Sequence, residues 1–325
     1  MPRRTVIFGG AGFLGLNLAE ALGARQFDVT LFDLSPPPAG AFEGIQVVVG
    51  DVRDRAAVAA AIEPGTDAVI WGAAITADAM RDAAEPETLL EVNLAALVPV
   101  LRHARDCGVR RLINLSSVAA YGESAYGAAA LCEDAPAPDP RSLYAVSKFA
   151  TERVCMRLGE LWSMDTVSVR LSAAFGPWER PTGSRDTPSP FMQLMRLAER
   201  SEEARLPGAG VCDWLYAPDA ALAVLALVDA PQLAHRIYNV GPGAMFPVSE
   251  WGAHLAGLRP GFHCRIAGPE ETPNVDLHRT RERAPLSIAR LARECGFAPG
   301  YDLARSVGHL DAWARAHPGW FGGAA

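Results

Sequence analysis

The sequence predicts a doubly wound α/β fold, in which a parallel sheet is covered by helices on both faces and a smaller α/β domain is partly interleaved with it. Two observations predict this fold. Through the first 170 residues, short and almost continuously apolar runs alternate with longer amphipathic ones, as in parallel strands that are buried on both faces and joined by helices. The first apolar run also leads directly into a glycine-rich turn at residues 9–15, which opens a helical pattern.

The elements follow from the periodicity of the apolar positions. The expected strands comprise residues 5–8, 29–32, 47–49, 68–71, 111–115 and 166–170, and the helical patterns between them cover 14–22, 58–62, 89–107 and 144–161. After Arg170 the pattern loosens, and residues 176–190 are rich in Pro, Gly, Ser and Thr, which predicts a loop. We therefore expect residues 1–170 to form the first domain and residues 171–325 to form mainly a substrate-binding domain, with a segment of about 211–240 returning to the first.

Composition excludes several classes of partner. The 325 residues carry a net charge of −7 and contain no run dense in Lys or Arg, which argues against nucleic acid or an anionic membrane surface as partner. No apolar run approaches the roughly 20 residues needed to span a bilayer. The six cysteines are scattered and the histidines show no ligand spacing. We therefore expect free thiols, a cytoplasmic protein and no metal site.

The glycine turn predicts a dinucleotide-binding site. Gly9, Gly12 and Gly15 lie between an expected strand and an expected helix, where a tight turn must let the backbone approach a pyrophosphate and let the helix pack on the strand. The pyrophosphate would bind at the helix N-terminus, where free N–H groups and the helix dipole favour an anion. Phe13 and Leu14 are cofactor-binding candidates for this reason.

Asp33 predicts which dinucleotide binds. It closes the second expected strand, eighteen residues after Gly15, where an acidic side chain accepts hydrogen bonds from the adenosine ribose and repels a 2′-phosphate. No basic residue follows in 34–38, so NAD is favoured over NADP. The alternative is that Asp33 only ends the strand.

Tyr144, Lys148 and two serines form a candidate catalytic set. Tyr144 and Lys148 are four residues apart in a helical pattern, so they share a face, and the lysine ammonium would stabilise a phenolate that acts as acid or base. Ser116 and Ser117 follow the strand at 111–115, at the strand end where such sheets bind ligands. Alternatively, the Tyr–Lys pair lies on the surface and the serines merely cap the strand.

On these features the chain resembles the extended short-chain dehydrogenases/reductases, the Rossmann-fold branch that contains NAD-dependent nucleotide-sugar epimerases and dehydratases. The resemblance covers nearly the whole length. The shared motifs are the glycine turn, Gly50-Asp51-Val52, Trp71-Gly72-Ala73-Ala74, Val92-Asn93-Leu94, Leu115-Ser116-Ser117-x-x-x-Tyr121-Gly122, Tyr144-x-x-x-Lys148 and Tyr238-Asn239-Val240-Gly241.

The resemblance implies a role for each of these residues. Tyr144 would be the acid/base on the substrate oxygen, Lys148 would hold the nicotinamide ribose and tune Tyr144, and Ser117 would hydrogen-bond the reacting oxygen. The family further implies a homodimer built on the helices at 89–107 and 144–161. The remaining cofactor-binding candidates are Asp51 and Val52 along the adenine, Ala73, Ala74 and Asn93 along the dinucleotide, and Ser116 and Ser172.

Departures from the family pattern narrow the reaction. Dehydratases of the family carry an Asp-Glu pair after the catalytic hydroxyl residue, but here 118–120 contain no acid, which disfavours dehydration. The nucleotide-sugar epimerases typically have an asparagine where this chain has Ala173 and an arginine where it has Cys212. Each missing phosphate contact removes about 1.5–3 kcal/mol of binding, so a nucleotide-linked substrate is disfavoured.

The loop after the sixth strand offers the substrate-binding candidates. Arg180 or Arg185 could clamp a carboxylate, and Trp178 and Trp214 could line an apolar or sugar face, with Thr76 as a further candidate. Alternatively, the arginines are solvated or pair with the acidic residues at 179 and 186.

The sequence therefore predicts an NAD-dependent oxidoreductase acting on a secondary alcohol or carbonyl of a small polar substrate, such as a sugar, sugar acid or hydroxy acid. An NAD-dependent (nucleotide-)sugar epimerase with tightly bound NAD is the alternative, because it would use the same catalytic residues. A non-catalytic NAD-binding protein is a third interpretation.

Overall fold

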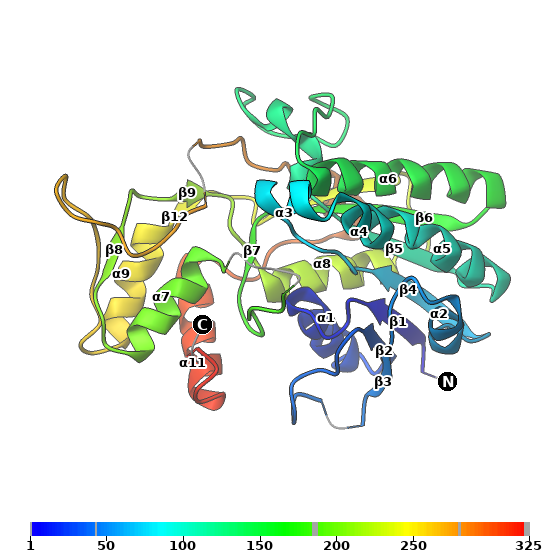
Figure 1. Cartoon of the computed structure of the whole chain (residues 1–325), viewed down its shortest axis with the longest axis horizontal. Helices are drawn as coiled ribbons and strands as arrows, with labels where there is room; N and C mark the ends of the chain where they lie inside the picture. Colours follow the sequence, from blue (N-terminus) through cyan, green and yellow to red (C-terminus); the bar gives the residue numbers. More distant parts are fainter. Residues whose placement is uncertain (1, 43, 184–187, 279–280, 322–325) are drawn as a thin grey trace.

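A seven-stranded parallel sheet forms the centre of the computed structural model, which describes residues 2–42, 44–183, 188–278 and 281–321. The strand order is β11-β6-β5-β4-β1-β2-β3, so the order reverses beside β1 (Figure 1). The expected Rossmann-type fold is confirmed, with β11 as a seventh strand paired to β6. The strands are β1 (Arg4–Phe8), β2 (Asp28–Asp33), β3 (Gln46–Val49), β4 (Thr66–Trp71), β5 (Arg111–Ser117), β6 (Asp165–Leu171) and β11 (Ile237–Val240).

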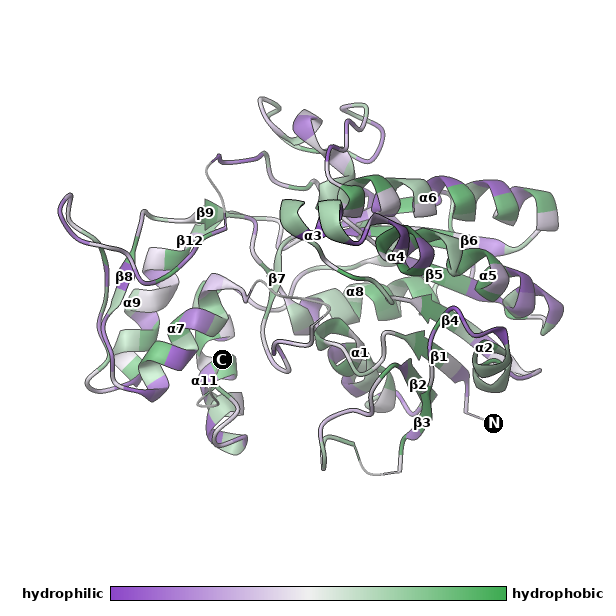
Figure 2. Cartoon of the chain, in the orientation of Figure 1, coloured by the Kyte–Doolittle hydropathy of each residue, from purple (hydrophilic) through white to green (hydrophobic). Residues whose placement is uncertain are grey.

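Alternate residues of the strands pack into two separate hydrophobic cores, one on each face of the sheet. Ile7 of β1 packs into the core beneath α1 (Phe13–Gly23) and α8 (Ala217–Asp229). Val6 and Phe8 pack into the core on the opposite face, beneath α2 (Arg55–Ala61), α5 (Leu97–Asp106) and α6 (Leu143–Trp162). Figure 2 shows the consequence, because the strands are mostly hydrophobic whereas the outer helices carry hydrophilic bands. Burial on both faces explains why the strands are continuous apolar runs in the sequence.

The helix expected at 89–107 is interrupted. The structure has α3 (Ala79–Ala84), α4 (Pro86–Leu90), a π-helical turn η1 (Glu91–Ala95) and then α5. Asn93 lies in the π-helical turn and bonds the backbone of Ile75 through its side chain. Single π-helical turns of this kind occur often at functional sites.

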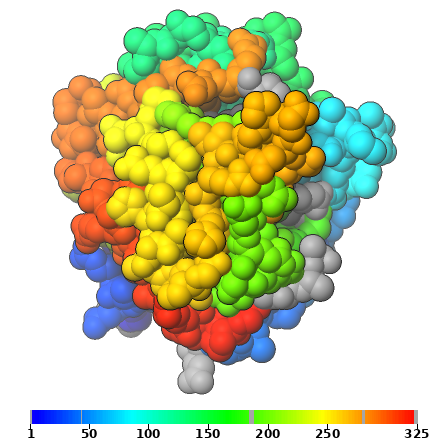
Figure 3. Space-filling model, turned by 90° about the vertical axis from the view of Figure 1, so that its left-hand side faces the viewer, coloured from blue at the N-terminus to red at the C-terminus, as the bar shows by residue number. Residues whose placement is uncertain are grey.

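The expected second domain contains helices and two-stranded sheets, and Figure 3 shows its green, yellow and orange segments side by side on one face of the molecule. Its core is aromatic, with the rings of Phe175 and Phe191 stacked at 3.8 Å and Trp251 edge-on to Phe191 at 5.0 Å. Its elements are β7 (Ala174–Phe175) with β10 (Leu215–Tyr216), β9 (Val211–Cys212) with β12 (Phe246–Pro247), β8 (Ala204–Leu206) with β13 (Cys264–Ile266), α7 (Pro190–Glu199), α9 (Val248–Leu258) and α11 (Leu303–Ala316). Short 3-10 turns η2 (Val118–Tyr121) and η3 (Glu123–Ala125) follow β5, and α10 (Ala289–Cys295) packs near β11.

Across the described ranges, no helix is both long and apolar enough to cross a membrane.

Candidate active site

The glycine turn is closed so tightly that Gly9 and Gly15 have no room for a side chain. The N–H groups of Gly9 and Gly10 both donate to the carbonyl of Phe32, at 2.9 and 3.1 Å. Gly9 has a φ of +75°, and a Cβ there would lie 2.9 Å from the backbone of Gly72. A Cβ on Gly15 would lie 2.3 Å from the carbonyl oxygen of Gly9. Helix α1 begins just after Gly12, which supplies no side-chain cap, so the turn and helix end fit the pyrophosphate of a dinucleotide.

Asp33 lies against this turn. Its Oδ2 accepts from the N–H of Ala11 at 3.0 Å, and its Oδ1 accepts from the N–H of Leu34 at 2.8 Å. Burial raises the pKa of Asp33, while these hydrogen bonds and the positive charge of Arg180 oppose the rise. The carboxylate is thus fixed beside the glycine turn, and its contact with an adenosine ribose stays a prediction.

Arg180, expected on the substrate, is placed at this same corner. Its Nη2 donates to the carbonyl oxygen of Ala11 at 3.2 Å, so Arg180 and Asp33 bind opposite sides of one residue of the turn. Burial lowers the pKa of Arg180, and Asp33 opposes this. Glu179, which the sequence offers as an alternative pairing partner for the arginines, accepts from the N–H and the hydroxyl of Ser189, at 2.8 and 2.6 Å.

Further predicted cofactor-binding residues follow β3 and β4. Asp51 pairs with Arg53 at 2.6 Å, and that contact lowers the pKa of Asp51, whereas Val52 is buried. Beyond β4, Asn93 Oδ1 accepts from the N–H of Ile75 at 2.7 Å and its Nδ2 donates to the carbonyl of Ile75 at 2.9 Å. This bidentate contact holds the backbone of Ile75, which lies between the predicted residues Ala74 and Thr76 and two positions after Ala73.

Helix α6 brings the predicted catalytic residues to the end of β5. Ser142 caps the helix by accepting from the N–H of Ala145 at 3.2 Å, so Tyr144 and Lys148 occupy its first two turns. Lys148 Nζ donates to the carbonyl of Leu115 at 2.8 Å and lies 5.6 Å from the centre of the Tyr144 ring. Ser117 is the last residue of β5, two residues beyond Leu115.

Lys148 is a buried ammonium. Burial lowers its pKa from 10.5 to about 8, while the negative charge of Glu152 opposes the shift. Lys148 is also the only lysine in the chain, which otherwise uses arginine for its basic residues. That the only lysine occurs in this motif is a further indication of a functional role, independent of the Tyr–Lys spacing.

Glu152 and Arg170 form a buried ion pair beside the candidate catalytic residues, which the sequence analysis did not predict. Arg170 donates to Glu152 through Nε at 2.9 Å and Nη2 at 2.7 Å, and the Arg170 and Glu152 side chains are 2% and 0% exposed. Ser116, predicted on the cofactor, donates its hydroxyl to Glu152 Oε1 at 2.6 Å. The available signal was a charged residue on the buried face of α6, matched by an arginine inside an apolar strand.

A second buried polar cluster joins the sheet to the second domain. Ser172, another predicted cofactor residue, donates its hydroxyl to the carbonyl of Asp213 at 2.5 Å and accepts from Arg283 Nη2 at 2.6 Å. Arg283 also pairs with the Asp213 carboxylate at 2.6 Å. The hydroxyl of Ser172 thus links the end of β6 to segments far along the chain.

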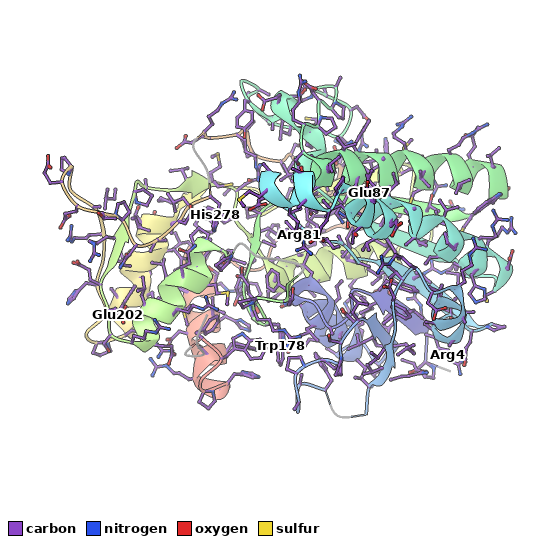
Figure 4. The ribbon with its side chains drawn as sticks, viewed as in Figure 1. Arg4, Arg81, Glu87, Trp178, Glu202 and His278 are labelled. Atoms are coloured by element: carbon purple, nitrogen blue, oxygen red, sulfur yellow. The ribbon has the colours of Figure 1, made fainter. Side chains whose placement is uncertain are left out.

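The two tryptophans expected around the substrate lie in different aromatic clusters. Trp178, which is labelled in Figure 4, has a φ of +66°. It is buried against Phe42 and against Trp313 of α11, at ring distances of 5.7 and 5.1 Å. Trp214 packs edge-on to Phe191 at 5.2 Å and donates Nε1 to the carbonyl of Gly210 at 2.9 Å. Arg185, the other expected clamp, lies outside the described residues.

Comparison with known proteins identifies the family. Residues 5–241 match the NAD dependent epimerase/dehydratase family. The chain is 28% identical over 297 residues to a UDP-glucose 4-epimerase of Mycolicibacterium smegmatis, covering 86% of this chain and 91% of the relative. It is 32% identical over 321 residues to sterol demethylase protein B of Methylococcus capsulatus, covering 91% and 93%. It is 31% identical over 243 residues to a D-erythronate dehydrogenase of Cupriavidus necator, covering 70% and 72%.

The solved structures agree with the fold and the cofactor. A Thermus thermophilus UDP-glucose 4-epimerase in complex with NAD superposes with a TM-score of 0.74 at 28% identity, covering 95% of this chain and 99% of the other. The chain belongs to the NAD dependent epimerase/dehydratase family and is an NAD-dependent enzyme of the extended short-chain dehydrogenase/reductase type.

Proposed function

We propose that this enzyme is an NAD-dependent dehydrogenase that oxidises a secondary alcohol of a sugar acid or hydroxy acid, with Tyr144 as the acid/base. The observation that supports the proposal is that Tyr144, Lys148 and Ser117 lie together at the end of β5, in a chain that has Ala173 and Cys212 at the positions of two family nucleotide-binding residues.

The chain's own residues account for the proton transfer. NAD, held by the glycine turn and Asp33, supplies the hydride acceptor when it is bound. Tyr144 Oη, as phenolate, takes the proton of the substrate hydroxyl, and the Lys148 ammonium stabilises that phenolate. Ser117 Oγ accepts from the N–H of Ala119 at 3.1 Å, so its hydroxyl proton can be donated to the substrate oxygen.

The substrate side favours an acid over a nucleotide-linked sugar. At the position of the family's phosphate-binding arginine, Cys212 is buried and donates Sγ–H to the Asp213 carboxylate at 3.1 Å. Ala173 occupies the position of the sugar-diphosphate asparagine, and 118–120 contain no acid for dehydration. The 31% identity to a D-erythronate dehydrogenase supports a sugar-acid substrate. Arg185 remains our candidate for binding the carboxylate of that substrate.

An epimerase is the second candidate, favoured by the 28% identity to a UDP-glucose 4-epimerase over 86% of the chain. An absorbance assay at 340 nm with added NAD separates the two. Net NADH formation with sugar acids or hydroxy acids, abolished by Tyr144→Phe, supports the dehydrogenase. Epimerised UDP-sugar without net NADH, together with NAD released on denaturation, would replace it with the epimerase. The panel also includes a sterol, because the chain is similar to sterol demethylase protein B. Turnover with the sterol alone would contradict our proposal of a small polar substrate.

We further propose that the enzyme is a cytoplasmic homodimer that pairs through α5 and α6. Val146 and Leu161 on α6 are 38% and 56% exposed, which suits a helix face covered by a partner. Light scattering on the wild type and on Leu161→Glu should give a dimer and a monomer; a wild-type monomer would contradict the proposal.

A further inference from the structure

The charge on Lys148 needs an explanation, because its ammonium is fully buried. Taking an ammonium out of water favours its neutral form. Lys148 Nζ donates to a backbone carbonyl, that of Leu115, which carries no net charge. A neutral amine could not stabilise the Tyr144 phenolate, so the centre requires a nearby negative charge.

Glu152 supplies that charge, and three contacts hold it in place. It follows Lys148 by four residues on α6, and residues at this spacing share one helix face. Ser116 on β5 donates to Oε1, and Arg170 on β6 donates to both carboxylate oxygens. With two strands pinning it, the carboxylate cannot rotate away from the lysine.

We propose that Glu152 is a positioning residue of the catalytic centre, which keeps the buried Lys148 ammonium charged, and that Arg170 limits how strongly it does so. The effect on turnover rests on the proposed acid/base role of Tyr144, but the effect on Lys148 itself does not.

The other titratable groups packed around Lys148 do not replace Glu152. On helix α6 these groups are Tyr144 and the buried thiol of Cys155. On β6 the group is Arg170, and on η2 it is Tyr121, whose ring lies 4.4 Å from the Arg170 guanidinium. The π-helical turn contributes the uncharged Asn93, 3.4 Å from the hydroxyl of Ser147. Within the described parts of α4, α5 and these neighbours, Glu152 is the one carboxylate that acts on the lysine.

Because Lys148 is the only lysine, its titration can be followed directly. Protein made with lysine labelled with ¹³C at Cε shows a single lysine side-chain resonance, and its pH dependence gives the Lys148 midpoint without any turnover. We expect Glu152→Gln to lower this midpoint, because the variant removes the negative charge one helical turn from Lys148.

A double variant guards against a folding failure, since Glu152→Gln leaves a buried arginine without its partner. In Glu152→Gln/Arg170→Met both charges are gone. We expect its midpoint to lie above that of the single variant but below that of the wild type, because Arg170 acts from beyond Glu152. If the single variant does not fold, the double variant decides the question.

Asp165→Asn is the matched control. It breaks the pair between Arg111 and Asp165, at 2.6 Å, which joins the same two strands at their opposite ends. It should leave the Lys148 midpoint unchanged. A midpoint in folded Glu152→Gln, or in the double variant, that equals or exceeds the wild-type value would overturn the proposal.

The activity profile follows with a defined sign. The ammonium is present below the Lys148 midpoint and is lost as pH rises through it, so the alkaline limb of kcat should move to lower pH in Glu152→Gln. A shifted resonance without turnover on any substrate would refute the proposed dehydrogenase and leave the role of Glu152 intact. An unshifted resonance in an active dehydrogenase would refute the role of Glu152 and leave the proposed dehydrogenase intact.

Discussion

Gly15 has the tightest backbone surroundings at the cofactor site, and this gives a prediction at the scale of one residue. A Cβ there would lie 2.3 Å from the Gly9 carbonyl oxygen and 2.6 Å from that of Gly10, both fixed backbone atoms. We expect Gly15→Ala to open the turn and weaken NAD binding at least tenfold, measured by calorimetry. Gly23→Ala is the control, because beyond its chain neighbours and the nearby backbone of its own helix no described atom lies within 4 Å of its Cβ. It should keep the affinity and gain roughly 0.5–1 kcal/mol of stability. Equal affinities in both variants would contradict this account.

Single residues also show what the sequence can and cannot predict. Tyr144 and Lys148 could be proposed as a pair because their chemistry requires a fixed local spacing on one helix. Arg180 could not be placed, because it lies in a segment without periodicity and reaches back to Ala11, 169 positions earlier in the chain. The partnership of Glu152 with Arg170 is likewise tertiary, since only strand pairing brings β6 beside the helix face that carries Glu152.

At the scale of elements, the apolar period identified the strands because both faces of the sheet are buried. The same period could not reveal the π-helical turn inside 89–107, where Asn93 bonds a loop after β4 that is distant in the sequence. The local pattern of apolar residues thus predicts whether a segment is a helix or a strand. It does not predict where a helix is interrupted, because that depends on contacts with residues distant in the sequence.

The π-helical turn leads to a prediction for this element. Asn93→Ala leaves the N–H and carbonyl of Ile75 without their side-chain partner, and an unsatisfied buried group costs about 1–3 kcal/mol. We expect the free energy of unfolding to fall by about that amount and NAD affinity to drop. Hydrogen exchange measures the cause, because the Ile75 amide should exchange faster while that of Ile70, inside β4, is unchanged. Uniformly faster exchange would instead indicate global destabilisation.

At the scale of the molecule, the C-terminal helix is connected to the cofactor turn through the loop after β7. Trp313 of α11 packs edge-on to Trp178 at 5.1 Å, and Trp320 donates Nε1 to the carbonyl of Glu179 at 3.0 Å. Arg180, the next residue, reaches the glycine turn at Ala11. The far end of the chain therefore helps to position the first turn.

This connection predicts that a change in α11 alters cofactor binding. Trp313→Ala removes a buried ring from the cluster around Trp178 and should cost about 3–5 kcal/mol of stability. It should also weaken NAD binding several-fold, because the loop that carries Arg180 loses its support. Trp162→Ala at the end of α6, where Arg105 lies over the indole at 4.8 Å, is the control and should reduce stability without changing NAD affinity. Calorimetric titration of both variants, at a temperature where each is folded, separates the two effects. If Trp313→Ala binds NAD as tightly as the wild type, α11 supports the second domain alone, and Arg180 is positioned by the contacts of its own loop.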